Sequence, residues 1–417
     1  MNRRSYAPWL LAACTALFVF LALPWPLAAS GDARPVRPGD GAARPPPSTP
    51  DELRLGEMGL DPDSDRYTAP MGPGRAVLTL VPRVQGRIEK FLADYRVPWA
   101  AAVLIEPATG RVLAMAEHSQ RDPSARGLSL QARAPAASVF KIVTSAALLQ
   151  RGFEPDAEVC FHGGHHRVQR NNLADDPRRD RRCLTLASAL GHSANVVFAK
   201  LADRALDAGL LRASAERLLF NTPIPFPQPV ETSRADIPED PFALATTAAG
   251  FGPVRLSPLH GALLAAIVAN GGVFVPPEVL SSVDGARAPQ QPGARRVLDE
   301  RVAADLAAMM RTTVTEGTAR QIFGQRRWRR SALQSLTVAG KTGSLSEPNP
   351  YRDYSWFVGF APVEHPRVAF AVVVMNERAW RIKAPAVARA ALEAWSEWEW
   401  GQMQASAAPV PGGRAAP

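Results

Sequence analysis

Segments with the pattern of β-strands lie near both ends of this 417-residue chain, and the stretch between them has the pattern of helices. Helical spacing of apolar residues dominates from residue 138 to about residue 270, and it also occurs at 84–95 and 384–400. Distant strands that share one sheet, with helices between them, are typical of α+β domains. We therefore expect an antiparallel five-stranded sheet flanked by helices, with an all-helical lobe inserted and strands at 99–106, 111–117, 336–340, 356–361 and 368–375.

Proline, glycine and charged residues mark the limits of the folded part. From residue 34 the sequence reads RPVRPGDGAARPPPSTP, a composition that buries too little apolar surface to order itself. A similar composition follows residue 401. We therefore expect a linker at 30–74, one domain at 75–400 and a disordered tail at 401–417.

An uncharged apolar stretch at 9–29 follows Arg3 and Arg4, and it is about long enough to cross a bilayer core of roughly 30 Å. Because the arginines precede the stretch, we expect residues 1–8 in the cytoplasm and the rest of the chain outside it. Two alternatives remain, a signal peptide cleaved near residues 28–30 and a lipoprotein signal that ends at Cys14. All three export the body of the chain.

The net charge of the chain is +9, from 48 Lys and Arg against 39 Asp and Glu. Such a charge favours anionic partners, and export excludes nucleic acid from the expected ones. We interpret the basic runs at 178–182 and 326–330 as solvated loops, with contact to an anionic wall or membrane as the alternative.

Three cysteines are too few for a miniature fold held together by disulfides. Cys160 and Cys183 are the two that lie outside the apolar stretch. Since exported proteins meet an oxidising environment, we expect a disulfide between them, which contributes about 3 kcal/mol. The histidines between them, His162, His165 and His166, are candidate metal ligands, but the neighbouring glycines and asparagines indicate a flexible surface loop, so we expect no metal.

The helix predicted from Ser138 to residue 152 carries a serine and a lysine three positions apart, Ser138 and Lys141. Residues at this spacing share one face of a helix. Serine becomes a nucleophile when a neighbour takes its proton, and a lysine can do this where burial or a second cation lowers its pKa. Taken alone, the pair is better explained as an N-cap serine with a surface lysine one turn later.

Two further motifs follow in order along the chain. Ser193 and Asn195 form an SxN motif in an apolar helical context, well after the SxxK pair. A KTGS motif, Lys341-Thr342-Gly343-Ser344, comes much later, at the end of a predicted strand. The ordered set SxxK, SxN and KTG resembles that of penicillin-binding proteins and serine β-lactamases.

The resemblance to the penicillin-binding transpeptidase domain covers about residues 98–380. It includes four more segments, IEPATG at 105–110, GFG at 250–252, EGTA at 316–319 and WFVGFAPVEHPRVAFAVVV at 356–374. The chain departs from the family at Ser344, where threonine is more usual, and at 136–137, where many members have Pro-Gly. We expect activity to survive both changes, because they keep the hydroxyl and the helix entry.

The resemblance implies a set of catalytic residues. Ser138 attacks the carbonyl between the two terminal D-alanines of a peptidoglycan stem peptide, and Lys141 is its general base. Lys341 lowers the pKa of Lys141 by its charge, and Ser193 relays a proton to the departing D-alanine. An amine from a second stem peptide then resolves the acyl-enzyme as a crosslink.

The resemblance also implies substrate contacts. Asn195 hydrogen-bonds the peptide amide, Thr342 and Ser344 hold the substrate carboxylate together with Lys341, and Gly343 lets a ligand backbone approach. The backbone N–H groups of Ser138 and Ser344 form an oxyanion hole, typically worth about 3 kcal/mol. β-Lactam antibiotics are expected to acylate Ser138, and neither a metal nor an organic cofactor is implied.

Three alternative functions stay open. A serine β-lactamase needs a deacylating base, for which Glu154, Glu158 and Glu231 are candidates by position only. A DD-carboxypeptidase uses water as the acceptor and has the same motifs, and a non-catalytic sensor would bind β-lactams or muropeptides as signals. We expect a transpeptidase that a single span holds in the inner (cytoplasmic) membrane, with its catalytic domain in the periplasm or its equivalent and with protein partners left open.

Overall fold

The computed structural model describes residues 52–288, 293–324 and 336–407. The chain divides into two compact units between Pro47 and Ser48, and every described residue belongs to the second. The predicted cytoplasmic segment 1–8, the apolar stretch 9–29 and the basic run 326–330 lie outside the described residues. Across the described ranges, no helix combines the length and the apolar character that a membrane span requires.

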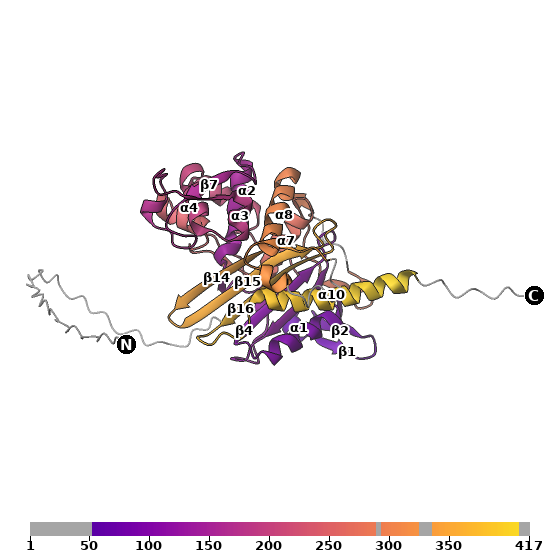
Figure 1. The fold of residues 1–417 in the computed structure, drawn as a ribbon. Helices are drawn as coiled ribbons and strands as arrows, with labels where there is room; N and C mark the ends of the chain where they lie inside the picture. Colours follow the sequence, from indigo (N-terminus) through magenta and orange to yellow (C-terminus); the bar gives the residue numbers. More distant parts are fainter. Residues whose placement is uncertain (1–51, 289–292, 325–335, 408–417) are drawn as a thin grey trace, which may run out of the picture. The chain divides into compact units, whose positions relative to one another are not determined.

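A five-stranded antiparallel sheet forms the centre of the described unit, in the strand order β14-β15-β16-β4-β5. Figure 1 shows β14, β15, β16 and β4 running across the middle of the molecule. The central strand β16 comes late in the sequence but pairs with β4, which comes early. This confirms the predicted α+β class and sheet, whose strands are β4 (Trp99–Ile105), β5 (Val112–His118), β14 (Ala339–Pro348), β15 (Tyr351–Ala361) and β16 (Val368–Asn376).

Helices cover both faces of this sheet, because both faces of its strands are apolar. Ala369, Ala371 and Val373 of β16 point into the core on the side of α7 (Pro258–Ala269). The intervening residues of β16 belong to a second core cluster on the other face, where β16 packs against α10 (Ala384–Ala407) and α1 (Pro82–Asp94) packs against α10 and β5. The last helix continues to Ala407, so the prediction of a disordered tail from residue 401 was wrong for residues 401–407, and residues 408–417 lie outside the described residues.

The inserted lobe lies beside α8 (Glu300–Thr315), as Figure 1 shows. Helix α8 packs against β14, against α7 and against α2 and α3 of the lobe. The prediction of an all-helical lobe was wrong in one respect, since the lobe also contains a two-stranded hairpin, β7 and β8, joined by the disulfide between Cys160 and Cys183. Its elements are α2 (Lys141–Gln150), β7 (Glu158–Phe161), β8 (Arg182–Thr185), α3 (Leu186–Gly191), α4 (Asn195–Ala205), α5 (Ala208–Arg217) and α6 (Pro241–Ala248).

A second five-stranded sheet, in the order β1-β2-β3-β11-β12, corrects the predicted linker at 30–74. Residues 52–74 fold because Leu53, Leu55 and Ala69 are buried and because β3 pairs with the distant β11. Within residues 52–74, Pro62 and Pro73 lie in turns, and Asp63 and Asp65 are exposed. Residues 30–51 of the predicted linker lie outside the described residues. The strands are β1 (Gly59–Asp61), β2 (Arg66–Met71), β3 (Gly74–Leu78), β11 (Leu280–Val283) and β12 (Ala286–Arg287).

Short elements connect these parts. Two small strand pairs join segments that are distant in sequence, β6 (Ala134–Pro135) with β9 (Arg255–Leu256), and β10 (Val273–Phe274) with β13 (Arg295–Arg296). The remaining helical turns are η1 (Leu55–Glu57), η2 (Leu128–Leu130), η3 (Ala137–Phe140), η4 (Arg170–Asn172) and α9 (Arg320–Phe323). The pairing of β6 with β9 brings Arg255 beside the segment that leads into the turn of Ser138.

Candidate active site

Ser138 lies on the 3-10 turn η3, one turn before the α-helix proper begins at Lys141. The Lys141 side chain is fully buried, and its Nζ lies 2.8 Å from the Ser138 Oγ. The same nitrogen donates to Asn195 Oδ1 at 2.7 Å and to the carbonyl oxygen of Ala249 at 2.6 Å. The lysine is therefore no surface residue, and its position is fixed from three sides.

These contacts match the neutral form of Lys141. A neutral amine has two N–H bonds and one lone pair. If the two N–H bonds point to Asn195 Oδ1 and the Ala249 carbonyl, the lone pair remains for the hydroxyl proton of Ser138. Burial lowers the pKa of Lys141 well below its usual value, and the charge of Lys341 lowers it further. The geometry thus permits, and the electrostatics favour, a lysine that accepts a proton.

Ser193 lies in the turn between α3 and α4, with a backbone φ of +55°. This left-handed conformation is uncommon for a residue other than glycine, and such strain is held in place by surrounding contacts. The Lys341 Nζ donates to the Ser193 Oγ at 3.0 Å and to the Thr342 carbonyl at 2.7 Å. Burial lowers the pKa of Lys341 to about 7.

The KTGS residues lie in the first half of β14, not at the end of a strand as we expected. In the described part of the chain, β14 pairs with β15 alone, so it forms one edge of the sheet. A Cβ on Gly343 would lie 3.2 Å from Val139 Cγ2 and 3.3 Å from the carbonyl oxygen of Ala136. Glycine at this position therefore allows the edge strand to lie close against the turn of Ser138.

A cavity of about 320 Å³ opens between this edge and the inserted lobe. The three motifs meet there, since Ser138, Ser193, Asn195, Thr342 and Ser344 all line it. Lys341 does not, because it is fully buried behind Ser193. The implied contact of Lys341 with a substrate carboxylate stays a prediction, since Lys341 itself is not a lining residue.

Further lining residues had not been predicted from the sequence to belong to this site. Thr318 and Trp356 had a signal, because they lie in the quoted segments EGTA and WFVGF, and the Thr318 hydroxyl is 2.5 Å from that of Thr342. Lys383 is exposed and supplies a cation at the cavity wall, although no motif marked it. The complete set is His166, Thr318, Ser355, Trp356, Lys383 and Pro385.

No carboxylate is among the described residues that line this cavity. Of the three candidate deacylating bases, Glu154 accepts from Arg301 Nη2 at 2.7 Å, and Glu231 accepts from the backbone N–H of Ala132 at 2.9 Å. Glu158 is exposed on β7. None of the three is brought to Ser138.

The loop between β7 and β8 contacts the end of the Asn195 side chain that does not bind Lys141. The Asn195 Nδ2 donates to the carbonyl oxygen of His166 at 2.9 Å, and the Val196 N–H donates to that of His165 at 3.2 Å. His162 lies apart from these two in its contacts, with its ring nitrogens on Asp180 Oδ1 and the carbonyl of Asn171. The backbone of His165 and His166 thus holds the start of α4, and His166 lines the cavity.

Lys200 of α4 holds this loop by a buried ion pair. Its Nζ is fully buried and lies 2.6 Å from Asp180 Oδ2 and 3.0 Å from the carbonyl oxygen of Cys160. The Asp180 side chain is only 6% exposed. Removal of one partner of such a pair leaves the other as an uncompensated buried charge.

We expect Lys200→Met to lower the free energy of unfolding by about 3 kcal/mol, because it leaves the Asp180 carboxylate without its buried cation. Arg204→Met is the control on the same helix. Arg204 pairs at the exposed surface with Asp175, which also lies 2.9 Å from Lys200 Nζ and so keeps a cation in this variant, and the loss should be under about 1 kcal/mol. Urea denaturation of the two variants measures both values. Equal losses in the two variants would contradict a structural role for the buried pair.

Comparisons with known proteins agree with this geometry. Residues 100–393 match the model of the penicillin binding protein transpeptidase domain. The chain is 29% identical over 316 residues to the peptidoglycan D,D-transpeptidase PbpA of Mycobacterium tuberculosis, which covers 66% of this chain and 62% of that protein. It is 26% identical over 345 residues to the stage V sporulation protein D of Bacillus subtilis, covering 76% and 52%. The chain thus spans about three fifths or less of these curated relatives.

Solved structures show the same likeness. The crystal structure of PBPA from Mycobacterium tuberculosis superposes with a TM-score of 0.62 at 25% identity, covering 78% of this chain and 81% of that one. The penicillin G acyl-enzyme complex of penicillin-binding protein A from the same organism gives a TM-score of 0.60 at 25% identity, with the same coverage of 78% and 81%.

Proposed function

This chain belongs to the penicillin-binding protein transpeptidase domain family, and from that premise we propose that it is a serine D-Ala-D-Ala transpeptidase that crosslinks peptidoglycan. The observation that carries the proposal is the 2.8 Å contact between Ser138 Oγ and the buried Lys141 Nζ. Family membership alone does not require an active enzyme, but an intact nucleophile and base do indicate one.

In the proposed reaction, Ser138 Oγ attacks the carbonyl carbon between the two terminal D-alanines of a stem peptide. Its proton passes to the Lys141 Nζ, whose other contacts are acceptors for N–H bonds. The negative charge that develops on the substrate oxygen is stabilised by the backbone N–H groups of Ser138 and Ser344. Such donors are typically worth about 3 kcal/mol in serine enzymes.

The carbon–nitrogen bond then breaks, and the departing D-alanine nitrogen takes a proton through the Ser193 hydroxyl. The 3.0 Å contact from Lys341 Nζ supports this role, because it supplies a donor behind the hydroxyl. Asn195 has its Oδ1 on Lys141 and its Nδ2 on the His166 carbonyl, so it holds the base while its side chain faces the cavity. An amine of a second stem peptide attacks the ester and frees Ser138.

Substrate recognition is proposed to use the hydroxyls of Thr342 and Ser344, which line the cavity beside the exposed ammonium of Lys383. A terminal carboxylate of a stem peptide suits this set of donors and positive charge. β-Lactams would acylate Ser138 for the same reason, as penicillin G does in the related acyl-enzyme complex. We also propose that the domain acts outside the cytoplasm, anchored by the apolar stretch 9–29.

Two alternatives differ from this proposal in the fate of the acyl-enzyme. A β-lactamase hydrolyses it quickly, and the lack of a carboxylate among the described lining residues speaks against that. A carboxypeptidase hydrolyses it with water, and it needs no residue beyond those already named.

The test follows the acyl-enzyme by intact-mass spectrometry of the full-length chain incubated with benzylpenicillin for minutes to hours. We expect a long-lived adduct of one whole penicillin. Rapid loss of the adduct with accumulation of penicilloate would make the protein a β-lactamase, and no adduct would refute the catalytic assignment. A D-Ala-D-Ala pentapeptide then separates the other two, since a transpeptidase forms a larger product only when an acceptor amine is added.

A further inference from the structure

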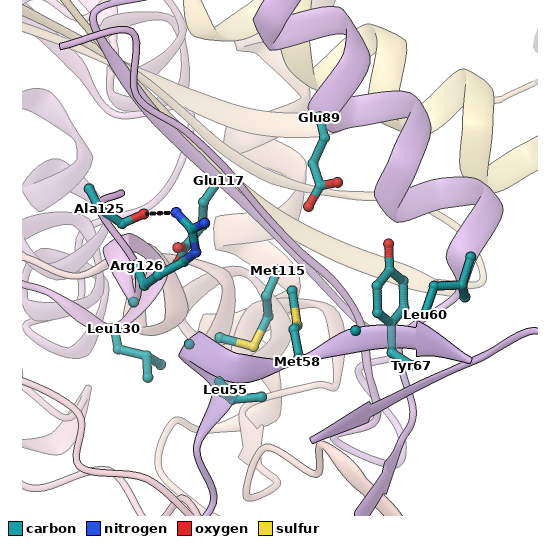
Figure 2. A pocket seen from close by; sticks show the side chains of 13 residues that line it. Leu55, Met58, Leu60, Tyr67, Glu89, Met115, Glu117, Ala125, Arg126 and Leu130 are labelled. Carbon is teal, nitrogen blue, oxygen red and sulfur yellow. Dashed lines mark hydrogen bonds between the residues drawn. The ribbon is translucent and has the colours of Figure 1, made fainter. Parts of the chain in front are cut away.

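A second cavity, of about 430 Å³, shares no lining residue with the active site. It lies between the N-terminal segment that forms η1, β1 and β2, the helix α1 and the edge strand β5. Figure 2 shows the side chains that line it. Its volume lies within the range of about 300–1,000 Å³ that is usual for small-molecule sites.

Apolar side chains form much of the wall of this cavity. Met58, Met115, Leu55 and Leu130 all line it, and Leu55 and Leu130 come from the turns η1 and η2. Met115, Leu55 and Leu130 are buried parts of the core. Methionine side chains adapt their shape readily to an apolar guest, so the walls suit an apolar body of varied outline.

The polar groups of the cavity are mainly acidic. Glu89 of α1 and Glu117 of β5 both line it, and the Tyr67 hydroxyl points toward Glu89. Each carboxylate is held by a neutral donor, Glu89 by the Gln85 Nε2 at 2.6 Å and Glu117 by the backbone N–H of Ser129 at 2.6 Å. Neither of these hydrogen bonds supplies a positive charge.

Arg126 is the cation among the described lining residues, and it is exposed. Its Nη1 donates to the carbonyl oxygens of Pro123 and Ala125. Burial raises the pKa of Glu89 and of Glu117. At Glu89 the charge of Glu117 adds to the rise, while the hydrogen bond from Gln85 and the charge of Arg126 oppose it. Two carboxylates that repel each other in a partly dry cavity are stabilised by a cation placed between them.

We propose that this cavity is a binding site for a small organic cation, an ammonium group on an apolar body. The body lies against Met58 and Met115, and the ammonium binds Glu89 with Tyr67 beside it. A neutral guest of the same shape gains the apolar contacts but leaves the carboxylates unpaired, and an anionic guest is repelled. The site is independent of the chemistry at Ser138.

The test uses three probes with one apolar body: 4-phenylbutylamine, 4-phenylbutanol and 4-phenylbutanoate. The full-length chain is labelled with ¹³C at its methionine methyl groups and titrated at pH 7.5. Met58 and Met115 report on the cavity, while Met309 and Met310 of α8 are internal controls in the core away from it. We expect saturable shifts at the first pair only, with the amine binding at least about tenfold more tightly than the alcohol.

Glu89→Gln tests the carboxylate, and Asp94→Asn is the matched control, an exposed carboxylate on the same helix that pairs with Lys90. The first variant should weaken the amine about tenfold and leave the alcohol unchanged, and the second should change neither. Amine affinity should also fall as the pH is lowered, because Glu89 takes up its proton at a higher pH than an ordinary glutamate. Equal affinities for amine and alcohol in the unchanged protein, or no saturable shift at Met58 and Met115, would overturn the proposal whether or not the variants fold.

Discussion

Ser138→Ala will form no adduct with benzylpenicillin, even at concentrations and times that fully label the unchanged protein. The hydroxyl is the atom that forms the ester, and its removal leaves the Lys141 amine with no proton to accept. Loss of a serine nucleophile in other enzymes costs on the order of 10⁶ in rate. Intact-mass spectrometry of the two proteins side by side measures the effect.

The matched control for this variant is Ser145→Ala. Ser145 lies on α2, the helix that follows the turn of Ser138, and is fully buried, and its hydroxyl has no hydrogen-bond partner among the described residues. This variant should therefore acylate at the normal rate, with a change in unfolding free energy within about 1 kcal/mol. Labelling of Ser138→Ala, or a similar loss in Ser145→Ala, would show that another group is the nucleophile.

Lys141→Met will slow acylation by about 10³-fold, because it removes the general base while keeping an apolar stem of similar length. The residual rate reflects the oxyanion donors and the binding of the β-lactam, which the substitution leaves in place. A fluorescent penicillin, followed over time by gel or anisotropy, gives the rate constant. Lys90→Met, an exposed lysine on α1, is the control and should acylate normally.

The pH dependence of acylation gives an independent measure of the same lysine. The rate in the unchanged protein should rise with pH as Lys141 loses its proton, and it should level off well below pH 10.5, because burial and the charge of Lys341 lower the pKa of Lys141. Lys341→Met removes that charge, so the inflection should move to higher pH. An inflection that stays in place, or moves to lower pH, would mean that Lys341 does not tune the base.

The residues of the active site could be named from the sequence because their chemistry is carried by short motifs. Ser138 and Lys141 are one turn apart, so a local pattern fixes their contact. The meeting of this pair with Ser193 and Lys341 depends on the packing of α3, α8 and β14, which the family resemblance supplied and the spacing alone did not. Lys341 showed the limit of that transfer, since it is buried behind Ser193 and does not reach the cavity.

The backbone contacts of the site could not be predicted from the sequence. The Ala249 carbonyl that binds Lys141 and the His166 carbonyl that binds Asn195 have no side-chain signature. Gly250 could have drawn attention, because its φ of +96° and the 2.5 Å from its ideal Cβ to the Ala137 carbonyl oxygen exclude other residues. It lies in the quoted segment GFG at 250–252.

The second sheet was not predicted, because it depends on strand pairing between segments that are distant in the sequence. Its strands β3 and β11 are far apart in the sequence, and each is short and at most partly buried, so neither shows a strong alternation of apolar and polar residues. The turn-forming composition of residues 52–74 then dominated the interpretation. The cavity with Glu89 and Glu117 is lined in part by this sheet, so it could not be predicted from the sequence either.

The position of β16 at the centre of the main sheet also governs how the chain reaches its native state. Ile105 of β4 pairs with Ala369 of β16 across most of the domain's sequence, and every residue of β4 is buried. Until residues 368–376 are available, β4 presents an unpaired apolar edge, which is a template for aggregation. Pairing over such a separation also slows folding. Ser138, Lys141 and Ser193 are thus synthesised long before the strand that completes the sheet beside them, and a chain cut off before residue 368 lacks the central strand of that sheet.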